Sequence, residues 1–226
     1  MTTPRATGCR LIPEADCPLY LRALVRALDG TTVSQLSLPL VARSMGTPRR
    51  KSAVLILLAD GPQGPDLLLT ARAATLRSHA GQPAFPGGAA EPGEDAVATA
   101  LREAQEETGL DPASVTAVAL LPELFLPPSG YLVAPVLGHW ERPGPVAVVD
   151  PAETAVVARV PVSTLADPAC RGRIRFPGGQ LGPAFDLPGL LVWGFTGALV
   201  DLVLRLGGWA RPWDADRRFE LPERAG

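Results

Sequence analysis

Residues 88–110 read GAAEPGEDAVATALREAQEETGL, and we interpret the rest of the chain outward from this stretch. Its apolar and small side chains recur at the three- and four-residue spacing of a helix with one buried face. They are Val97, Ala100, Leu101, Ala104 and Thr108. Acidic residues follow Gly93 at the start, and Gly109 is typical of the residue after a helix end. We therefore expect a helix over about 94–108.

Three glutamates crowd the last two turns of this predicted helix. Because successive residues turn by about 100°, Glu103 and Glu107 lie about 40° apart and Glu106 lies about 60° to the other side. Carboxylates at this spacing repel one another, and the C-terminal end of a helix disfavours anions. Mg²⁺ or Mn²⁺ takes oxygen ligands and would cancel the repulsion. The pattern taken alone leaves two interpretations open, a metal site and a solvated acidic face.

The residues around the glutamates follow the pattern G-x5-E-x7-R-E-U-x-E-E-x-G-U, in which U is a bulky apolar residue; Ala104 is small for its U position, which is a mild departure. It is met by Gly88, Glu94, Arg102, Glu103, Glu106, Glu107, Gly109 and Leu110. Seven fixed positions match by chance on the order of once in 10⁸ windows. The stretch resembles the Nudix box, the signature of Nudix hydrolases. This resemblance implies an α/β/α sandwich with a mixed sheet, in which the box holds Mg²⁺ or Mn²⁺ against a substrate diphosphate.

The resemblance also implies roles for individual residues. The metal ligands would be Glu103, Glu106, Glu107 and the carbonyl of Gly88, which is a ligand by family analogy. Arg102 would orient a carboxylate of the box through an ion pair, and Glu94 would fix the loop. The general base stays open: Glu106 and Glu107 are candidates within the box, and Glu153 is the best candidate outside it, ahead of Glu123. A surface position at a strand edge is an equally good interpretation of Glu153.

Residues 68–88, LLTARAATLRSHAGQPAFPGG, carry a second signature. They resemble the pattern LLT-x-R-[SA]-x3-R-x3-G-x3-FPGG that marks the coenzyme A diphosphatase branch of the Nudix hydrolases. Arg72 and Arg77 would bind phosphates, because the guanidinium group grips phosphate oxygens bidentately. Gly87 and Gly88 would let the backbone approach the substrate. We interpret His79 as a structural side chain.

The branch resemblance implies hydrolysis of coenzyme A and its derivatives to 3′,5′-ADP and 4′-phosphopantetheine or its acyl form. Two alternatives remain. One is a Nudix hydrolase of another nucleoside diphosphate derivative, such as ADP-ribose or a dinucleotide. The other is a Nudix-fold binding protein without turnover, which the complete set of box carboxylates disfavours.

Apolar runs bounded by turn residues predict the remaining elements. Strands are expected at 53–59, 66–70, 114–121, 131–137 and 153–160, with a loop over 122–130, a hairpin of 173–176 with 182–185, and helices at 19–28 and 193–206. Strands that alternate with helices indicate a mixed sheet between helices. We expect an N-terminal helix and linker over 1–50, the Nudix domain over 51–210 and a tail over 211–226. The first helix would pack on the domain or on a partner subunit.

Composition limits the class of protein. The chain has 226 residues, 46% hydrophobic and 19% charged, with a net charge of −2 and a pI of about 5.7. This is an ordinary globular composition without the positive charge that nucleic-acid binding needs. Cys9, Cys17 and Cys170 lack metal-ligand spacing, which indicates reduced thiols. No apolar run has the length of a membrane span or the position of a signal core, so we expect a cytoplasmic protein. We expect it to be a monomer or a homodimer. The basic run 49–51 is the end of a linker or a contact for an anionic substrate tail.

Overall fold

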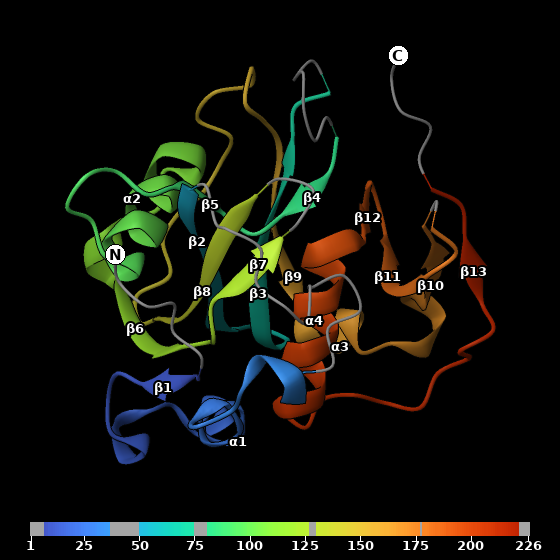
Figure 1. Ribbon diagram of the computed structural model, residues 1–226, viewed down its shortest axis with the longest axis horizontal. Coiled ribbons are helices and arrows are strands. Elements are labelled where there is room, and N and C mark those ends of the chain that lie inside the picture. Colours follow the sequence, from blue (N-terminus) through green and yellow to red (C-terminus); the bar gives the residue numbers. More distant parts are fainter. Residues whose placement is uncertain (1–6, 37–49, 75–80, 127–129, 177, 222–226) are drawn as a thin grey trace.

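The computed structural model describes residues 7–36, 50–74, 81–126, 130–176 and 178–221. Its centre is a nine-stranded sheet in the order β1-β6-β8-β2-β3-β4, to which β5, β7 and β9 are attached through β2, β8 and β3 (Figure 1). The strands are β1 (Cys9–Arg10), β2 (Arg50–Gly61), β3 (Gly64–Arg72), β4 (Pro83–Ala84), β5 (Gly87–Ala89), β6 (Val115–Leu120), β7 (Leu124–Leu126), β8 (Tyr131–Trp140) and β9 (Thr154–Pro161).

Strand β2 is at the centre of this sheet, parallel to β8 and antiparallel to β3. Its side chains alternate between two buried clusters, as expected for a strand covered on both faces. Leu55 and Leu57 pack with Ala100 of α2 (Ala96–Thr108). Ile56 and Leu58 pack in the other cluster, which holds α1 (Leu19–Leu28) and α4 (Gly194–Leu206). Helices therefore cover both faces, and the predicted α/β/α sandwich with a mixed sheet is confirmed.

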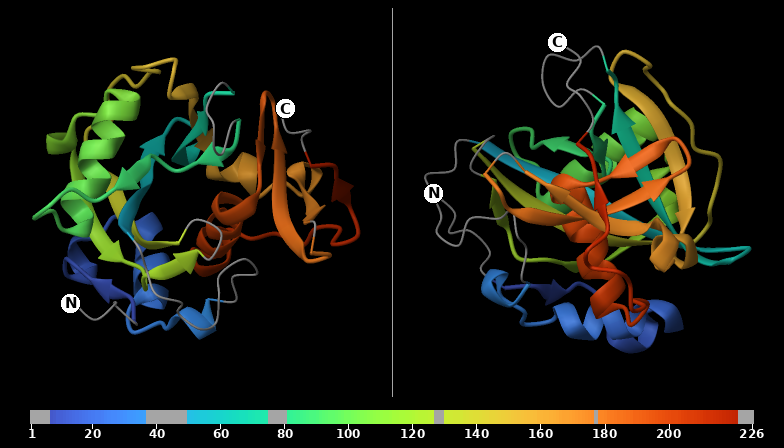
Figure 2. Two further views of the ribbon diagram at one scale, coloured as in Figure 1. Left: turned by 45° about the horizontal axis from the view of Figure 1, so that its top comes forward. Right: turned by 90° about the vertical axis from the view of Figure 1, so that its right-hand side faces the viewer.

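A second sheet follows the first in the chain and lies on the far side of α4 (Figure 2). It has the order β12-β11-β10-β13, with β10 (Arg171–Arg175), β11 (Leu181–Leu187), β12 (Leu190–Val192) and β13 (Arg218–Phe219). The short helix α3 (Val162–Leu165) connects it to β9. The β10–β11 hairpin confirms the predicted pairing of these two stretches.

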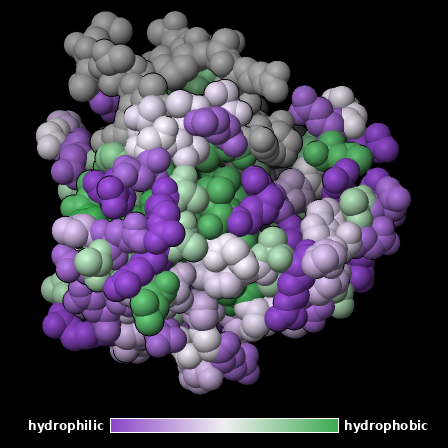
Figure 3. All heavy atoms as spheres, turned by 90° about the horizontal axis from the view of Figure 1, so that it is seen from below, coloured by the Kyte–Doolittle hydropathy of each residue, from purple (hydrophilic) through white to green (hydrophobic). Residues whose placement is uncertain are grey.

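The N-terminal helix covers the central sheet of its own chain. Leu21, Leu24, Val25 and Leu28 are buried in the cluster that also holds α4, whereas Leu19 at the first position is 80% exposed. The face of the molecule that is seen from below shows hydrophobic side chains only as separate small patches between polar ones (Figure 3). The helix predicted at 19–28 is confirmed, with its apolar face turned inward.

Several boundaries differ from the prediction. Helix α2 begins at Ala96, two residues late, because Asp95 accepts a 2.8 Å hydrogen bond from Ala98 N and so acts as the N-cap. Strand β2 begins at Arg50, because its pairing with β8 runs from Arg50 to Ala59; Arg50 and Lys51 therefore belong to a strand rather than to a linker. Strand β7 lies inside the stretch predicted as a loop at 122–130, and it pairs with β8.

None of the helices in the described residues is long and apolar enough to cross a membrane. The three cysteines Cys9, Cys17 and Cys170 are free thiols, as the sequence indicates.

Candidate active site

The predicted box forms a loop and helix beside β5. Helix α2 ends at Gly109, whose left-handed backbone (φ 71°) is the conformation that glycine adopts most easily. Gly88 in β5 touches the second-to-last turn of α2, since a Cβ placed there would lie 2.4–2.5 Å from the carboxylate atoms of Glu103. The absence of a side chain at Gly88 therefore sets how closely the Glu103 carboxylate approaches the β5 backbone.

Glu107 is the carboxylate most withdrawn from solvent in this region. Its Oε2 accepts a hydrogen bond of 3.2 Å from Gly87 N. Burial is the main reason why the pKa of Glu107 rises to about 7. The hydrogen bond from Gly87 and the positive charge of Arg72 lower the pKa of Glu107, whereas the negative charges of Glu103 and Glu153 raise it further. Glu107 thus lies within electrostatic reach of Arg72, Glu103 and Glu153, in a place where an added cation would stabilise its ionised form.

Arg102 links the loop before α2 to the glutamates of the helix. Its Nε donates to Glu94 Oε1 at 2.7 Å, and its Nη1 donates to Glu103 Oε1 and Glu106 Oε2, each at 3.0 Å. Its Nη2 donates to the carbonyl of Ala89 in β5 at 3.0 Å. The hydrogen bond from Arg102 is the main reason why the pKa of Glu94 falls to about 2. Arg102 thus forms ion pairs with Glu94, Glu103 and Glu106, and its orienting role stays a prediction.

The three box glutamates do not converge in this structure. The side chain of Glu106 is 58% exposed and is paired with Arg102 one turn earlier, whereas that of Glu103 is 17% exposed. Within the described parts of the chain, no group of three or more His, Cys, Asp or Glu side chains is arranged to hold a metal ion. Metal ligation by Glu106 therefore stays a prediction.

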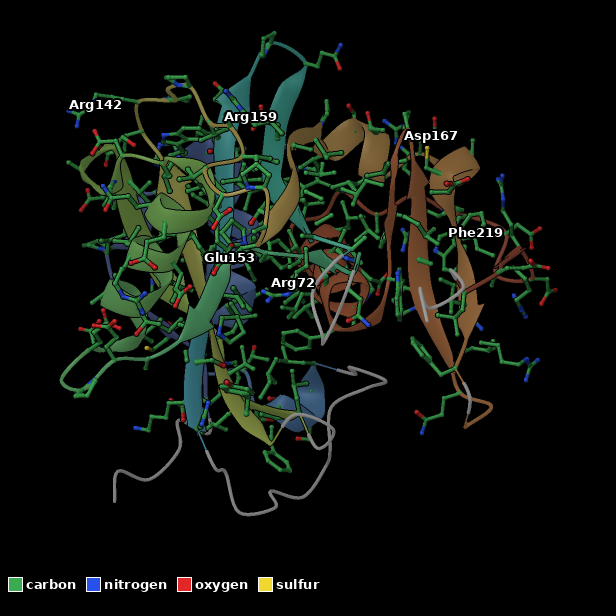
Figure 4. The ribbon with its side chains drawn as sticks, turned by 90° about the horizontal axis from the view of Figure 1, so that it is seen from above. Arg72, Arg142, Glu153, Arg159, Asp167 and Phe219 are labelled. Atoms are coloured by element: carbon green, nitrogen blue, oxygen red, sulfur yellow. The ribbon has the colours of Figure 1, made fainter. Side chains whose placement is uncertain are left out.

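Arg72 and Glu153 lie together at the adjoining strand ends (Figure 4). Arg72 ends β3, and Glu153 directly precedes β9; the carbonyl of Glu153 accepts a 2.8 Å hydrogen bond from Ala73 N. The Nε of Arg72 is buried and has no hydrogen-bond partner in the described part of the chain. A buried guanidinium nitrogen needs an acceptor, so this atom is suited to an anionic ligand. Arg77 and His79 lie outside the described residues, and Glu123 directly precedes β7.

The donor atoms of this site are the right kind for a hard divalent ion. Glu103 and Glu107 bring carboxylate oxygens to β5. Ligation by the Gly88 carbonyl stays a prediction. Burial raises the pKa of both Glu103 and Glu107, because it disfavours the charged carboxylate. A bound cation would stabilise the charged form and lower both pKa values again. These residues fit Mg²⁺ or Mn²⁺.

The sequence did not single out Thr99, which supports the site from inside the fold. Thr99 is fully buried, and its Oγ1 donates to Glu94 Oε2 at 2.9 Å. Glu94 Oε2 also accepts a hydrogen bond of 2.9 Å from Glu91 N. The apolar spacing gave no signal for Thr99, because in the predicted helix this residue lies on the side of Glu103 and Glu106, opposite the apolar positions.

Comparison with known proteins adds to this geometry. Residues 49–176 match the family described as NUDIX domain. The chain is 45% identical over 130 residues to the protein named uncharacterized Nudix hydrolase NudL of Photorhabdus laumondii, a match that covers 57% of this chain and 68% of that protein. It is 49% identical over 90 residues to the NudL of Escherichia coli, covering 39% of this chain and 46% of the relative. The chain thus spans about half to two thirds of these relatives.

Solved structures give a more distant similarity. A Nudix hydrolase of M. smegmatis, RenU, has 21% sequence identity and a TM-score of 0.48, with coverage of 74% of this chain and 90% of that chain. A MutT protein of Methanosarcina mazei has 19% identity and a TM-score of 0.46, with coverage of 72% and 96%. Both TM-scores are below 0.5, so no conclusion about function is drawn from these structures.

Proposed function

The chain belongs to the NUDIX domain family, and from this premise we propose that it is a metal-dependent hydrolase of coenzyme A and its derivatives. The proposed reaction cleaves the diphosphate bond and releases 3′,5′-ADP together with 4′-phosphopantetheine or its acyl form. The observation that carries the proposal is the pair of groups formed by the buried Glu107 carboxylate, whose pKa is raised by burial and lowered in part by the charge of Arg72, and the buried Nε of Arg72, which has no hydrogen-bond partner among the described residues. The Glu107 carboxylate suits a cation, and the Arg72 guanidinium suits a phosphate.

The substrate preference rests on the segment that contains Arg72. Coenzyme A carries a 3′-phosphate in addition to its diphosphate, so its recognition requires cationic donors beyond the metal. Arg72 ends β3, and Arg77 follows five residues later in the same signature. We propose that these arginines bind phosphate oxygens of coenzyme A, including those of the 3′-phosphate.

The residues of the chain divide the chemistry between them. Mg²⁺ or Mn²⁺, held by Glu103, Glu106, Glu107 and the Gly88 carbonyl, would neutralise the diphosphate and lower the pKa of a bound water. Arg102 holds Glu103 and the β5 backbone in place through its hydrogen bonds. A carboxylate accepts the proton of the attacking water, and Glu107 and Glu153 are the two candidates near Arg72. Phosphoryl transfer depends mainly on such positioning and charge neutralisation.

Product analysis tests this proposal. The purified protein is incubated with coenzyme A in ¹⁸O water, with Mg²⁺, with Mn²⁺ or with a chelator, and the products are identified by mass spectrometry. We expect 3′,5′-ADP and phosphopantetheine only in the presence of metal, with ¹⁸O in one product that identifies the attacked phosphorus. ADP-ribose and a dinucleotide are assayed in parallel. Faster release of AMP from these compounds would contradict the coenzyme A assignment but keep the hydrolase, and no turnover of any of them would contradict the enzyme itself.

A further inference from the structure

The backbone of residues 81–89 carries the contacts that shape the site. Gly87 N donates to Glu107, Gly88 packs against Glu103, and the carbonyl of Ala89 accepts from Arg102. Between Gly87 and the strand pair β3–β4, the chain is fixed by the burial of Phe85 and by the hydrogen bond of 2.8 Å from Leu55 N to Pro86 O. The positions of Glu103 and Glu107 therefore depend on how firmly this segment is held.

The segment begins in β4, which is the outermost strand of the sheet path and has only two residues, Pro83 and Ala84. Arg72 N donates to Gln82 O at 3.0 Å, so by the alternation of an antiparallel pair the carbonyl of Pro83 points away from β3. Pro83 has no N–H, which leaves its carbonyl as the hydrogen-bonding group of this residue. An edge strand this short is weakly held by its own ladder.

Thr196 in the first turn of α4 supplies the missing partner. Its Oγ1 donates to the Pro83 carbonyl at 2.9 Å, and Thr196 is only 6% exposed. The two residues are 113 positions apart in the chain, and the contact joins α4 to the outer side of β4, beside it in Figure 1. A buried carbonyl that loses such a donor is unsatisfied, and the segment shifts to find another.

We propose that Thr196 is a positioning residue for the hydrolytic site: its hydroxyl anchors β4, and through the continuous backbone of residues 83–88 it holds the Gly87 N–H and Gly88 against Glu107 and Glu103. This inference rests on the proposed hydrolase function, because its effect on turnover is exerted through these two carboxylates. Thr196 itself touches no reacting atom.

The test compares Thr196→Val with Thr196→Ser. Valine keeps the shape and removes the donor, whereas serine keeps the hydroxyl. A displacement of the carboxylates by about 1 Å costs on the order of 100-fold in rate, so for Thr196→Val we expect kcat to fall by about 10-fold to 100-fold, with KM for the substrate within about threefold of wild type. Thr196→Ser is expected to retain kcat within about threefold. Val203→Ala is the control: Val203 is a buried residue of the same helix that lies in the apolar cluster, so this variant loses stability but keeps kcat.

Hydrogen exchange of the Gly87 amide, measured by NMR without substrate or metal, gives a second readout that needs no activity. We expect exchange at Gly87 to rise at least about tenfold in Thr196→Val and to stay near wild type in Thr196→Ser and Val203→Ala, because only the valine variant lacks the hydroxyl that holds β4.

Equal exchange and equal kcat in Thr196→Val and wild type would overturn the proposal, as would equal losses in the valine and serine variants. If wild type hydrolyses none of the diphosphates, the proposed function fails, while the exchange at Gly87 still decides whether Thr196 anchors the segment. If Thr196→Val does not fold, Thr196→Ala is measured by the same exchange experiment.

Discussion

Gly88→Ala tests the geometry of the site through a single added methyl group. The backbone at Gly88 is not in the left-handed region and pairs with Ala53 in the sheet, so alanine is compatible with the local conformation. The new Cβ would lie 2.4 Å from the nearest carboxylate atoms of Glu103, whereas ordinary contact begins at 3.4 Å. The Glu103 carboxylate must therefore move by about 1 Å. The moving group is the end of a flexible side chain, so the fold is expected to absorb the change at little cost in stability.

Catalysis is expected to be far more sensitive than stability. A misplacement of about 1 Å costs on the order of 100-fold in rate, which corresponds to about 2.7 kcal/mol of barrier. The assay measures kcat with Mg²⁺ or Mn²⁺ on the best substrate, together with thermal unfolding. Gly144→Ala is the matched control, because Gly144 has no atom within 4 Å of an added Cβ and its backbone suits alanine. If Gly88→Ala retains wild-type kcat, the approach of Glu103 to β5 has no role in turnover and the reasoning is refuted.

Three further predictions address the box, the substrate and the response to pH. Glu106→Gln is expected to lower kcat by about a thousandfold, roughly 4 kcal/mol of barrier, with thermal unfolding unchanged; near-normal turnover would remove Glu106 from the metal ligands. Arg72→Ala and Arg77→Ala are expected to raise KM more for coenzyme A than for its 3′-dephospho form, and equal changes on both substrates would show that neither arginine reads the 3′-phosphate. Burial lowers the pKa of His139 from its ordinary value of 6.5, so the folded state holds fewer protons on this ring than the unfolded chain, and the contribution of His139 to the free energy of unfolding is expected to fall as pH drops below about 6.5. The raised pKa of Glu107 acts in the opposite direction, so the contribution of His139 is the difference between wild type and His139→Gln. Urea unfolding at pH 7.5 and 5.0 checks this, and an equal slope in His139→Gln would contradict the assignment to His139.

The helix of the box was predictable because its signals are local. The apolar spacing, the acidic start and Gly109 all act within a few residues, and α2 ends where the sequence indicates. The ion pair of Arg102 with Glu106 is also a local, one-turn contact. The longer strands of the central sheet, β2, β3, β6, β8 and β9, were predicted for the same reason, since apolar runs bounded by turn residues mark buried strands.

The sequence by itself determined the helices α1, α2 and α4, the longer strands, the family signature and the chemistry of the candidate groups. The tertiary structure decided which of these groups meet: Glu107 against Gly87, Arg72 beside Glu153, and Thr196 on Pro83. It also decided that β4 and β7 exist, since such short strands form only because β3 and β8 offer them partners. The physical reason is the range of the forces. Helix spacing and caps act between residues a few positions apart, whereas burial, pKa shifts and sheet edges depend on contacts between segments that only the folded chain brings together.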